Sequence, residues 1–269
     1  MSKPVSIIVA GCAGRMGRAI LKAVRDAEGV KLAGGFDRPD CAQRGQDLMR
    51  LVGVEDSGLA ILAPDEINMA KADVLVDFTS PESAIENARR CADAGVAMVI
   101  GATGFSSGQD EAVAACAKEI AVVKSGNMSL GVNALCALAE RAAALLGEAY
   151  DIEITDAHHR HKVDAPSGTA LMLGAAAARG RGVDFEKNAV CDRTSRDTPR
   201  GRDEIGFSVT RGGGIIGEHS VRLIAEDEEV VLSHKALDRA LFARGAVAAA
   251  RWVAGRAPGL YSMRDVLGI

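Results

Sequence analysis

Aromatic residues are scarce in this chain of 269 residues: Phe, Trp and Tyr make up 3% of it, although 48% of the residues are hydrophobic. A core of that composition must be built from Ala, Val, Leu and Ile, the mixture typical of alanine-rich helices laid on aliphatic strands. An apolar content this high also excludes an intrinsically disordered chain. The composition therefore predicts a folded α/β protein.

The sequence also lacks cysteines at short spacing. Its six cysteines stand far apart and form no CxxC pair: Cys12, Cys41, Cys91, Cys116, Cys136 and Cys191. This pattern excludes a dense disulfide framework and a thiolate metal site. A reducing, cytoplasmic environment fits it best.

An excess of one charge and a long apolar run are missing as well. The net charge is −4 with both signs interspersed, so no long-range field would gather nucleic acid or an anionic membrane. No apolar segment approaches the roughly 20 residues that span a bilayer. The N-terminal "MSKPVSIIVAGCAGRMG" loosely imitates a secretion signal, but its apolar run is too short. We expect a soluble protein with neither nucleic acid nor membrane as partner.

The first half alternates short apolar runs with helical patterns. Five runs rich in aliphatic residues predict strands at 5–10, 30–36, 73–78, 97–101 and 121–125. Stretches near 82–94 and 108–118 have the spacing of helices. Repeated β-α-β units imply a parallel sheet, and hence a Rossmann-like, doubly wound α/β domain.

Three glycines follow the first predicted strand. Gly11, Gly14 and Gly17 separate it from a helical pattern, and Asp37 ends the second strand twenty residues beyond Gly17. Such a loop lets the backbone approach a pyrophosphate, the helix start faces the phosphate charge, and the acid can hold the adenosine ribose. The same triplet can mark an ordinary tight turn in a chain with 30 glycines. The strand, the helix and the acid together favour dinucleotide binding.

Asp37 and Arg38 bear on the choice of cofactor. A carboxylate suits an unphosphorylated ribose and repels a 2′-phosphate, whereas an arginine has the opposite preference. The pair predicts tolerance of both NADH and NADPH, unless Arg38 is only a solvated surface charge. The loops 101–104 and 125–133 follow later strands and are further candidates, because ligands of open α/β sheets lie at the carboxyl ends of strands. Strand exits need small turn residues in any case.

All five histidines lie between 151 and 239. Three of them, His158, His159 and His161, occur within four positions, next to Lys162 and before a Ser-Gly-Thr turn at 167–169. The surrounding pattern predicts a strand at 151–159, a helix from about 167 and antiparallel strands between 205 and 236. This is a smaller α+β domain with a mostly antiparallel or mixed sheet. We expect a two-domain enzyme with a cleft between the domains, because cofactor loop and histidines come from different halves.

Three interpretations of the histidine block stay open from the residues alone. A metal site would use His159 and His161, but an evident third ligand is missing. The histidines could instead be structural and simply hydrogen-bonded. In the third interpretation the block binds an anion and moves a proton: Lys162 supplies positive charge, the helix start offers N–H groups to a carboxylate, and a histidine titrates near neutrality.

Seven segments, in order and over nearly the whole chain, are similar to those of one known family: "GCAGRMGR", "VDFTSPE", "VIGATGF", "SGNMSLGVN", "EITDAHHRHKVDAPSGTA", "EIGFSVTRGGGIIGEH" and "MRDVL". The sequence resembles bacterial dihydrodipicolinate reductase, most specifically in the histidine block. The resemblance implies that a nicotinamide hydride reduces a small dicarboxylate, the cyclic product of the preceding synthase, to tetrahydrodipicolinate on the diaminopimelate route to lysine. It also implies an NADH- or NADPH-binding domain of residues 1–129 with 240–269. Residues 130–239 would bind the substrate and build a homotetramer through their sheet.

The resemblance also implies residue roles, motif by motif. His158 corresponds to the proton donor or acceptor, and Lys162 to a second catalytic residue that provides a proton and charge. His159, Gly168 and Thr169 correspond to substrate contacts, and no metal ligand is implied. The implied cofactor contacts are Gly11, Cys12, Ala13, Gly14, Arg15, Met16, Asp37, Arg38, Gly101, Ala102, Thr103, Ser125, Gly126, Asn127 and Met128.

The chain departs from the family pattern at three cofactor positions. Ala102 stands where threonine is common, Met128 where phenylalanine is frequent, and Asp37 where glutamate is often found. These departures bear on cofactor preference and loop contacts. Two other functions remain as alternatives: another NAD(P)-dependent two-domain dehydrogenase of a small acid, or a non-catalytic dinucleotide sensor. The first would lack the "HHRHK" block with its "PSGT" anchor, and the second predicts binding without turnover.

Overall fold

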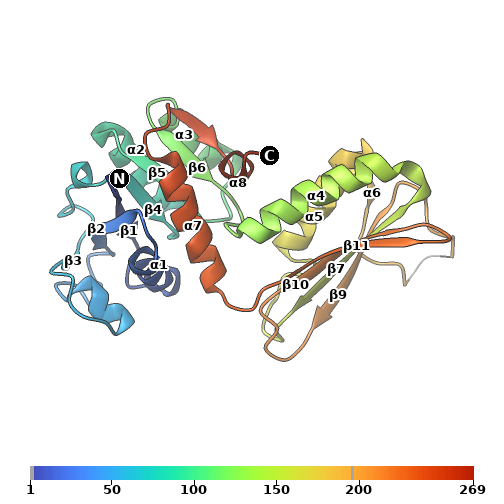
Figure 1. Cartoon of the computed structure of the whole chain (residues 1–269), viewed down its shortest axis with the longest axis horizontal. Helices are drawn as coiled ribbons and strands as arrows, with labels where there is room; N and C mark the ends of the chain where they lie inside the picture. Colours follow the sequence, from blue (N-terminus) through green and yellow to red (C-terminus); the bar gives the residue numbers. More distant parts are fainter. Residues whose placement is uncertain (1–2, 195–196) are drawn as a thin grey trace. The chain divides into compact units, whose positions relative to one another are not determined.

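The chain folds into two compact units in a computed structural model that describes residues 3–194 and 197–269. The first unit comprises Met1–Ser129 and Ala240–Gly268, and the second comprises Leu130–Arg239 (Figure 1). The C-terminal segment thus returns to the unit formed by the N-terminal half.

The first unit is built on one parallel sheet. Its strands are β1 (Val5–Ala10), β2 (Val30–Phe36), β3 (Ile61–Leu62), β4 (Val74–Asp77), β5 (Ala97–Ile100), β6 (Ala121–Lys124) and β12 (Gly259–Tyr261). They lie in the order β12-β6-β5-β4-β1-β2-β3, and every neighbouring pair is parallel. The helices are α1 (Arg15–Asp26), α2 (Pro81–Ala94), α3 (Ser107–Cys116), α7 (Ala240–Val253) and α8 (Met263–Leu267), with 3₁₀ turns at Leu48–Val52 and Met69–Lys71.

Helices cover both faces of this sheet, which explains why its central strands are almost wholly apolar. Alternate residues of β1 point to opposite layers: Ile7 packs in a core with residues of α1 and α7, and Ile8 packs in a second core with residues of α2 and α3. Helix α7 contacts α1 (Figure 1). Helix α7 also lies against the segment that follows β6, because a Cβ atom on Gly245 of this helix would lie 1.7 Å from the carbonyl oxygen of Met128.

The strand order reverses beside β1. β2 and β3 continue the sheet to one side of β1, whereas β4, β5 and β6 continue it to the other. In a doubly wound sheet the crevice for a ligand lies at this reversal, outside the carboxyl ends of the strands. The predicted Rossmann-like parallel sheet is confirmed.

The second unit has a mixed sheet. Its strands are β7 (Asp151–His158), β8 (Ala189–Val190), β9 (Ile205–Arg211), β10 (Glu218–Ile224) and β11 (Glu229–Lys235), in the order β11-β10-β7-β9-β8. β7 is antiparallel to β10 and parallel to β9. The helices are α4 (Leu130–Leu146), α5 (Gly168–Arg181) and α6 (Phe185–Asn188), with a 3₁₀ turn at Gly147–Ala149. This confirms the predicted α+β unit.

One face of the mixed sheet is buried. Residues along β7 alternate between half-buried and buried, and the buried ones begin with Ile152 and Ile154. They pack against α5 and against the apolar side of α4 in a third core. The alternation sets the direction of every side chain on β7, because successive residues of a strand point to opposite faces.

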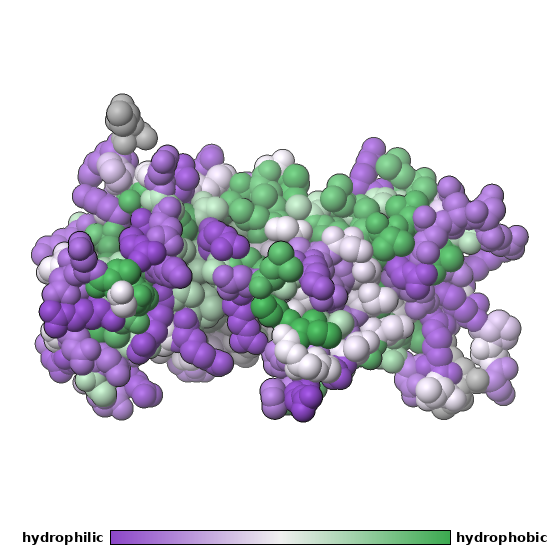
Figure 2. Space-filling view, turned by 60° about the horizontal axis from the view of Figure 1, so that its bottom comes forward, coloured by the Kyte–Doolittle hydropathy of each residue, from purple (hydrophilic) through white to green (hydrophobic). Residues whose placement is uncertain are grey.

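Helix α4 corrects one expectation. With the turn after it, Leu130–Ala149 spans 20 residues at a mean hydropathy of 1.3, so one segment does reach membrane-spanning length and apolarity. Val132, Leu135 and Ala139 on this helix belong to the third core, and a core helix of a soluble protein has the same composition. Other apolar residues lie at the surface in patches between hydrophilic ones (Figure 2).

Candidate functional site

The first candidate site begins where β1 ends. Gly11 has a φ of +62°, a left-handed conformation that favours glycine, and a Cβ atom there would lie 2.8 Å from Cγ2 of Thr79. Gly14 precedes α1, and a Cβ atom on Gly17 would lie 2.2 Å from the carbonyl oxygen of Gly11. The glycines therefore let the first turn of α1 lie directly against the strand-to-helix turn. The first N–H groups of a helix have no partners within it, so they are available to an anion.

A pocket of about 440 Å³ lies at this edge of the sheet. Its lining includes predicted and unpredicted residues: Gly11, Ala13, Gly14, Asp37, Arg38, Asp40, Cys41, Ala42, Gln43, Phe78 and Thr79. Pocket and glycine turn coincide, as expected for a dinucleotide site at the reversal of strand order.

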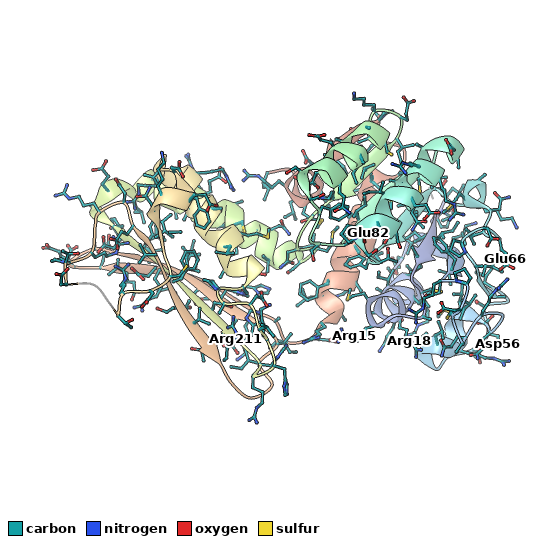
Figure 3. The ribbon with its side chains drawn as sticks, turned by 180° about the vertical axis from the view of Figure 1, so that it is seen from behind. Arg15, Arg18, Asp56, Glu66, Glu82 and Arg211 are labelled. Atoms are coloured by element: carbon teal, nitrogen blue, oxygen red, sulfur yellow. The ribbon has the colours of Figure 1, made fainter. Side chains whose placement is uncertain are left out.

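Asp37 is fixed by backbone hydrogen bonds at the rim of this pocket. One carboxylate oxygen accepts from the N–H of Ala13 at 2.9 Å, and the other accepts from the N–H of Arg38 at 2.9 Å. The Arg38 side chain is largely exposed, and its guanidinium forms an ion pair with Asp40 at 3.1 Å. Figure 3 shows Arg15 and Arg18 on α1, and Arg18 donates to the carbonyl oxygen of Ala13 at 2.9 Å.

The other predicted cofactor residues fall into two groups. Arg15 and Met16 begin α1, and residues 101–103 and 125–128 follow β5 and β6 at the carboxyl edge of the sheet. The side chains of Cys12 and Met128, however, are buried in the first core. Burial raises the pKa of the Cys12 thiol to about 12, so it stays a neutral thiol. These two positions can offer only backbone atoms to a ligand.

Gly101 and Thr79 each depend on a neighbouring side chain beside the pocket. A Cβ atom on Gly101 would lie 2.2 Å from the ring of Phe78, so this glycine makes room for a side chain that lines the pocket. Thr79 also lines the pocket and was not predicted. Its N–H and hydroxyl both donate to the buried carboxylate of Asp77, at 2.8 and 2.6 Å. Its place directly after the strand run "LVDF" was the available signal.

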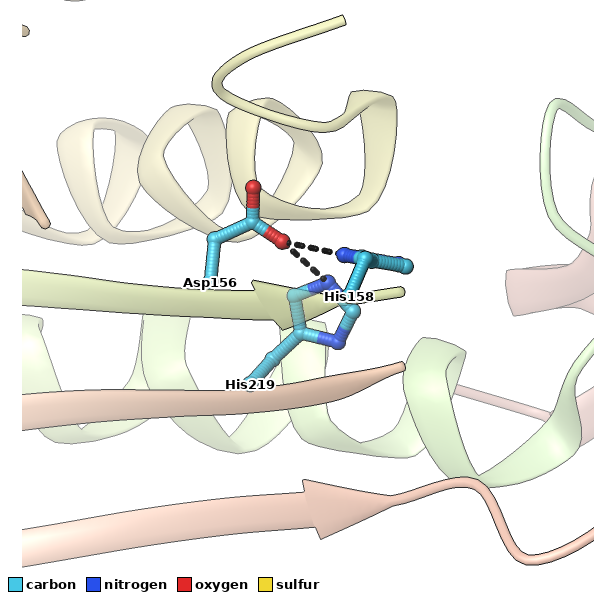
Figure 4. Close-up of side chains that lie close together, drawn as sticks. All are labelled: Asp156, His158 and His219. Atoms are coloured by element: carbon cyan, nitrogen blue, oxygen red, sulfur yellow. Dashed lines mark ion pairs between the residues drawn. The ribbon is translucent and has the colours of Figure 1, made fainter. Parts of the chain in front are cut away.

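The second candidate site lies at the end of β7. Asp156 and His158 are two residues apart, so both point to the inward face, where their side chains are buried. Nδ1 of His158 lies 2.7 Å from Oδ1 of Asp156. Nε2 of His219, from β10, lies 3.3 Å from the same oxygen (Figure 4). The two imidazole rings meet edge to face with centroids 5.1 Å apart.

Asp156 is surrounded by hydrogen-bond donors. Its second oxygen accepts from the guanidinium of Arg211 at 3.0 Å and from the N–H of Ser167 at 2.8 Å. Burial alone would raise the pKa of this carboxyl, but the hydrogen bonds from His219, Ser167 and Arg211 outweigh it and hold the pKa well below the usual range. Asp156 is therefore a carboxylate at neutral pH.

His158 is biased toward its neutral form. Burial lowers the pKa of its imidazole, His219 and Lys162 lower it further, and the carboxylate of Asp156 opposes them. A Cβ atom on Gly217 would lie 3.1 Å from Nε2 of His158. Glycine at position 217 therefore leaves Nε2 without a side chain pressed against it.

The remaining histidines of the block follow the end of the strand. The rings of His159 and His161 lie 6.2 Å apart, and Nε2 of His159 is 3.0 Å from the guanidinium of Arg239. Lys162 forms an ion pair with Asp164 at 2.8 Å. Successive residues of a strand point to opposite faces, and of the three histidines only His158, on β7, has its side chain in the buried network.

The start of α5 completes this site. The hydroxyl of Ser167 accepts from the N–H of Ala170 at 3.2 Å and lies 3.1 Å from Nε2 of His219. A Cβ atom on Gly168 would meet nothing within 4 Å, so this position opens to free space. The N–H of Ser167 already donates to Asp156, so it is not available to an incoming anion.

Three metal-type donors also converge here. Single ligand atoms of Asp156, His158 and His219 lie within 4.8 Å of one another. This set differs from the His159 and His161 pair that the sequence suggested. In a tetrahedral zinc site, bonds of about 2.0–2.1 Å would place neighbouring donors about 3.3 Å apart. The 2.7 Å between His158 and Asp156 is instead a hydrogen-bond separation.

Comparison with known proteins gives the family. Two protein-family models match the chain. The one described as dihydrodipicolinate reductase, N-terminus, matches residues 5–128, and the one described as dihydrodipicolinate reductase, C-terminus, matches residues 131–267. The chain belongs to the dihydrodipicolinate reductase family. The resemblance seen in the sequence motifs is confirmed.

The relatives match this chain over nearly its whole length. The 4-hydroxy-tetrahydrodipicolinate reductase of Caulobacter vibrioides is 49% identical over 270 residues, covering 100% of this chain and 99% of the relative. That of Brucella abortus (strain 2308) is 48% identical over 266 residues, covering 98% and 99%. Among solved structures, a dipicolinate-bound dihydrodipicolinate reductase from Paenisporosarcina sp. TG-14 matches with a TM-score of 0.76 at 23% identity, over 97% of this chain and 98% of that one. An amine dehydrogenase from Mycobacterium smegmatis shares the fold with a TM-score of 0.60 at 15% identity, over 96% and 95%.

Family membership leaves three residues of the second site to be explained. Asp156, Arg211 and His219 were not singled out from the sequence, and the structure brings Arg211 and His219 to the carboxylate of Asp156, which lies beside His158. The "GEH" triplet, 217–219, was part of the family resemblance and was the available signal for His219. Asp156 lies in the similar segment "EITDAHHRHKVDAPSGTA" and Arg211 in "EIGFSVTRGGGIIGEH", but nothing in either segment indicates that the two side chains meet.

Proposed function

We propose that this chain catalyses the NADH- or NADPH-dependent reduction of 4-hydroxy-tetrahydrodipicolinate to tetrahydrodipicolinate, with loss of the 4-hydroxyl group as water, in the diaminopimelate route to lysine. The end-to-end likeness to 4-hydroxy-tetrahydrodipicolinate reductases carries this conclusion. The histidine block at the start of α5 agrees with it, because a small dicarboxylate needs cationic and N–H anchors together with a proton-transfer group.

The residues of the first unit fit a nicotinamide dinucleotide. The close approach of Gly17 to the Gly11 turn leaves the first N–H groups of α1 open to a pyrophosphate, and the pocket beside them ends at Asp37. The bound cofactor supplies the hydride. Asp37 would hold the adenosine ribose, and Arg38 would accept a 2′-phosphate, so the unit accommodates both cofactors. The loops 101–103 and 125–128 would line the rest of the site from β5 and β6.

In the second unit, Lys162, His159 and the start of α5 would anchor the two substrate carboxylates. Gly168 is open to solvent and has no side chain, so a carboxylate can reach its N–H and that of Thr169. The Lys162 ammonium lies within reach of a carboxylate, as its ion pair with Asp164 demonstrates. The substrate would exchange places with Asp164 at the ammonium.

His158 would exchange the proton that accompanies hydride transfer. Its Nε2 lies beside Gly217, which has no side chain, while its Nδ1 lies 2.7 Å from Asp156. Positioned proton transfer of this kind contributes typically ~10²–10⁴ in rate. Lys162 would add a proton and fixed positive charge beside the developing anion.

Assembly and location extend the proposal. We propose a homotetramer formed through the second unit, because α4 and α5 cover only one face of its sheet. The other face carries small polar pairs such as Ser220 and Ser233, whose hydroxyls lie 3.0 Å apart, and the half-exposed Val231. A cytoplasmic location suits the six cysteines, all of which are free thiols. Light scattering on the purified protein tests the assembly directly, because a monomer at micromolar concentration would contradict it.

The decisive experiment follows NADH and NADPH absorbance with freshly generated product of the preceding synthase. We expect rapid oxidation by the wild-type protein and at least a ~10²-fold loss of kcat in His158→Gln and in Lys162→Ala. Calorimetry should show NADH binding unchanged in both variants, because neither residue belongs to the first unit.

The same experiment separates the alternatives. Cofactor binding without turnover would indicate a dinucleotide sensor, and turnover of a different small acid would indicate another dehydrogenase. Unchanged turnover in both variants would contradict the roles given to His158 and Lys162.

A further inference from the structure

One buried carboxylate joins the two parts of the second site. Asp156 contacts Nδ1 of His158 through one oxygen and the N–H of Ser167 through the other, at 2.7 and 2.8 Å. The imidazole that would move the proton and the helix start that would bind the substrate are therefore held by the same side chain. The link between His158 and Ser167 is made by the side chain of Asp156 and not by the residues between them in the sequence.

His219 closes the network from a second strand. Its Nε2 lies 3.3 Å from Asp156 and 3.1 Å from the hydroxyl of Ser167, and this hydroxyl accepts from Ala170 within the first turn of α5. Two oxygens thus face one imidazole nitrogen, so Nε2 is the protonated nitrogen of His219. His219 ties the Asp156 carboxylate to the cap of α5 from the opposite side.

The network sets the tautomer of His158. Apart from the 2.7 Å ion-pair contact with Oδ1 of Asp156, Nδ1 of His158 has no hydrogen-bond partner among the described residues, and Asp156 is ionised and accepts only. The neutral ring must therefore carry its proton on Nδ1. Nε2, which lies beside Gly217, is left with its lone pair for an incoming proton.

We propose that Asp156, supported by His219 and Arg211, is a positioning residue that fixes the His158 tautomer and aligns it with the substrate-anchoring start of α5. The inference rests on the proposed function for its catalytic consequence. Asp156 does not touch the substrate or the cofactor in this proposal. It acts through His158 and Ser167.

Asp156→Asn tests the proposal with little change in shape. The amide can still accept from Ser167, but it no longer carries the charge, and its NH₂ group can donate to Nδ1 of His158, which reverses the tautomer. We expect kcat to fall by about 10²-fold or more, while the KM for NADH stays within about twofold. Asp151→Asn, on the same strand, is the matched control because it loses an ion pair with Arg200 far from His158.

The pH profile separates positioning from a merely structural role. The charged and titratable groups facing His158 are Asp156 on its own strand, His219 on β10 and Lys162 in the following loop, with Arg211 of β9 on the far side of Asp156. Loss of the Asp156 charge removes the main group that favours the imidazolium. The limb of kcat/KM governed by His158 should therefore move to lower pH in Asp156→Asn. A variant that is only less stable would keep the wild-type profile at reduced amplitude.

Nitrogen NMR on the wild-type protein gives a test that does not depend on turnover. Shifts of ¹⁵N-labelled histidines, assigned with His158→Gln, should show His158 protonated at Nδ1 above its pKa. A proton on Nε2 would overturn the proposal, as would an unchanged kcat and pH profile in folded Asp156→Asn. One equivalent of zinc per chain in the purified protein would also overturn it, because Asp156 would then be a ligand. If the wild-type protein fails to reduce the substrate, the proposed function fails while the NMR result still decides the tautomer.

Discussion

Gly17→Ala is the sharpest test of how the first unit binds its cofactor. The added Cβ atom would lie 2.2 Å from the carbonyl oxygen of Gly11, which falls 1.2 Å short of the 3.4 Å at which ordinary contact begins. It would also lie 2.6 Å from Cα of Cys12. Both neighbours are backbone atoms, so no side-chain rotation can relieve the overlap. The start of α1 or the glycine turn must move by about an ångström.

The expected magnitude follows from two opposing effects. Overpacking of this kind costs typically 1–3 kcal/mol, whereas replacing glycine by alanine within a helix gains at most about 1 kcal/mol. We therefore expect a net loss of free energy of unfolding of about 1–2 kcal/mol, and a Tm lower by several degrees. The Kd for NADH should rise at least about tenfold, because the displaced helix start no longer presents its N–H groups to the pyrophosphate.

Differential scanning calorimetry and titration with NADH measure the two quantities. Gly108→Ala is the control, since this glycine also lies in a helix but a Cβ atom there meets nothing within 4 Å. It should leave NADH binding unchanged and stability unchanged or slightly higher. Wild-type stability and NADH affinity in Gly17→Ala would refute the reasoning, because the close approach would then have no energetic consequence.

Three further outcomes follow from the structure. Gly180→Ala in α5 should lower the free energy of unfolding of the second unit by about 1–3 kcal/mol in denaturant titration, because its Cβ atom would lie 2.0 Å from a carbonyl oxygen of α4. An unchanged denaturation midpoint would show that α4 and α5 can move apart at no cost in free energy. Burial lowers the pKa of both His158 and His234, so the unfolded chain binds more protons than the folded one as pH falls from about 6.5. Tm should therefore decline between pH 7.5 and 5.5, and it should decline less in His234→Gln. A Tm that does not change over this pH range would contradict neutral buried imidazoles. Asp37→Ala should raise the KM for NADH more than that for NADPH, and Arg38→Ala should do the reverse; equal effects on both cofactors would remove these residues from the ribose site.

Much of the first unit could be predicted because its signals are local. A strand, a glycine turn and a helix follow one another within the first 26 residues, and each is specified by neighbours in the chain. The direction of His158 was likewise available from strand alternation. Alternation does not show which side chains of the neighbouring strands lie near His158, because the pairing of β7 with β9 and β10 depends on the whole sheet.

Burial also escaped local reasoning. Cys12 and Met128 lie in segments that resemble cofactor loops, but their side chains pack in the first core. Thr79 received no special weight, although Asp77 holds it against the Gly11 turn. The apolar segment of α4 and the 3₁₀ turn after it, Leu130–Ala149, was not recognised in the sequence as long enough to span a membrane. In each case the side chain's surroundings come from elements distant in the sequence.

The sequence by itself determined the parallel sheet, the glycine turn and the block of His158 with Lys162, because these depend on periodicity and on residues within a few positions of one another. Only the tertiary structure decided that Asp156 holds His158, and that a histidine 52 positions beyond Ser167 contacts it. The physical reason is that a buried carboxylate must find its partners wherever the fold brings donors together. Those partners are set by strand pairing and helix packing rather than by distance along the chain.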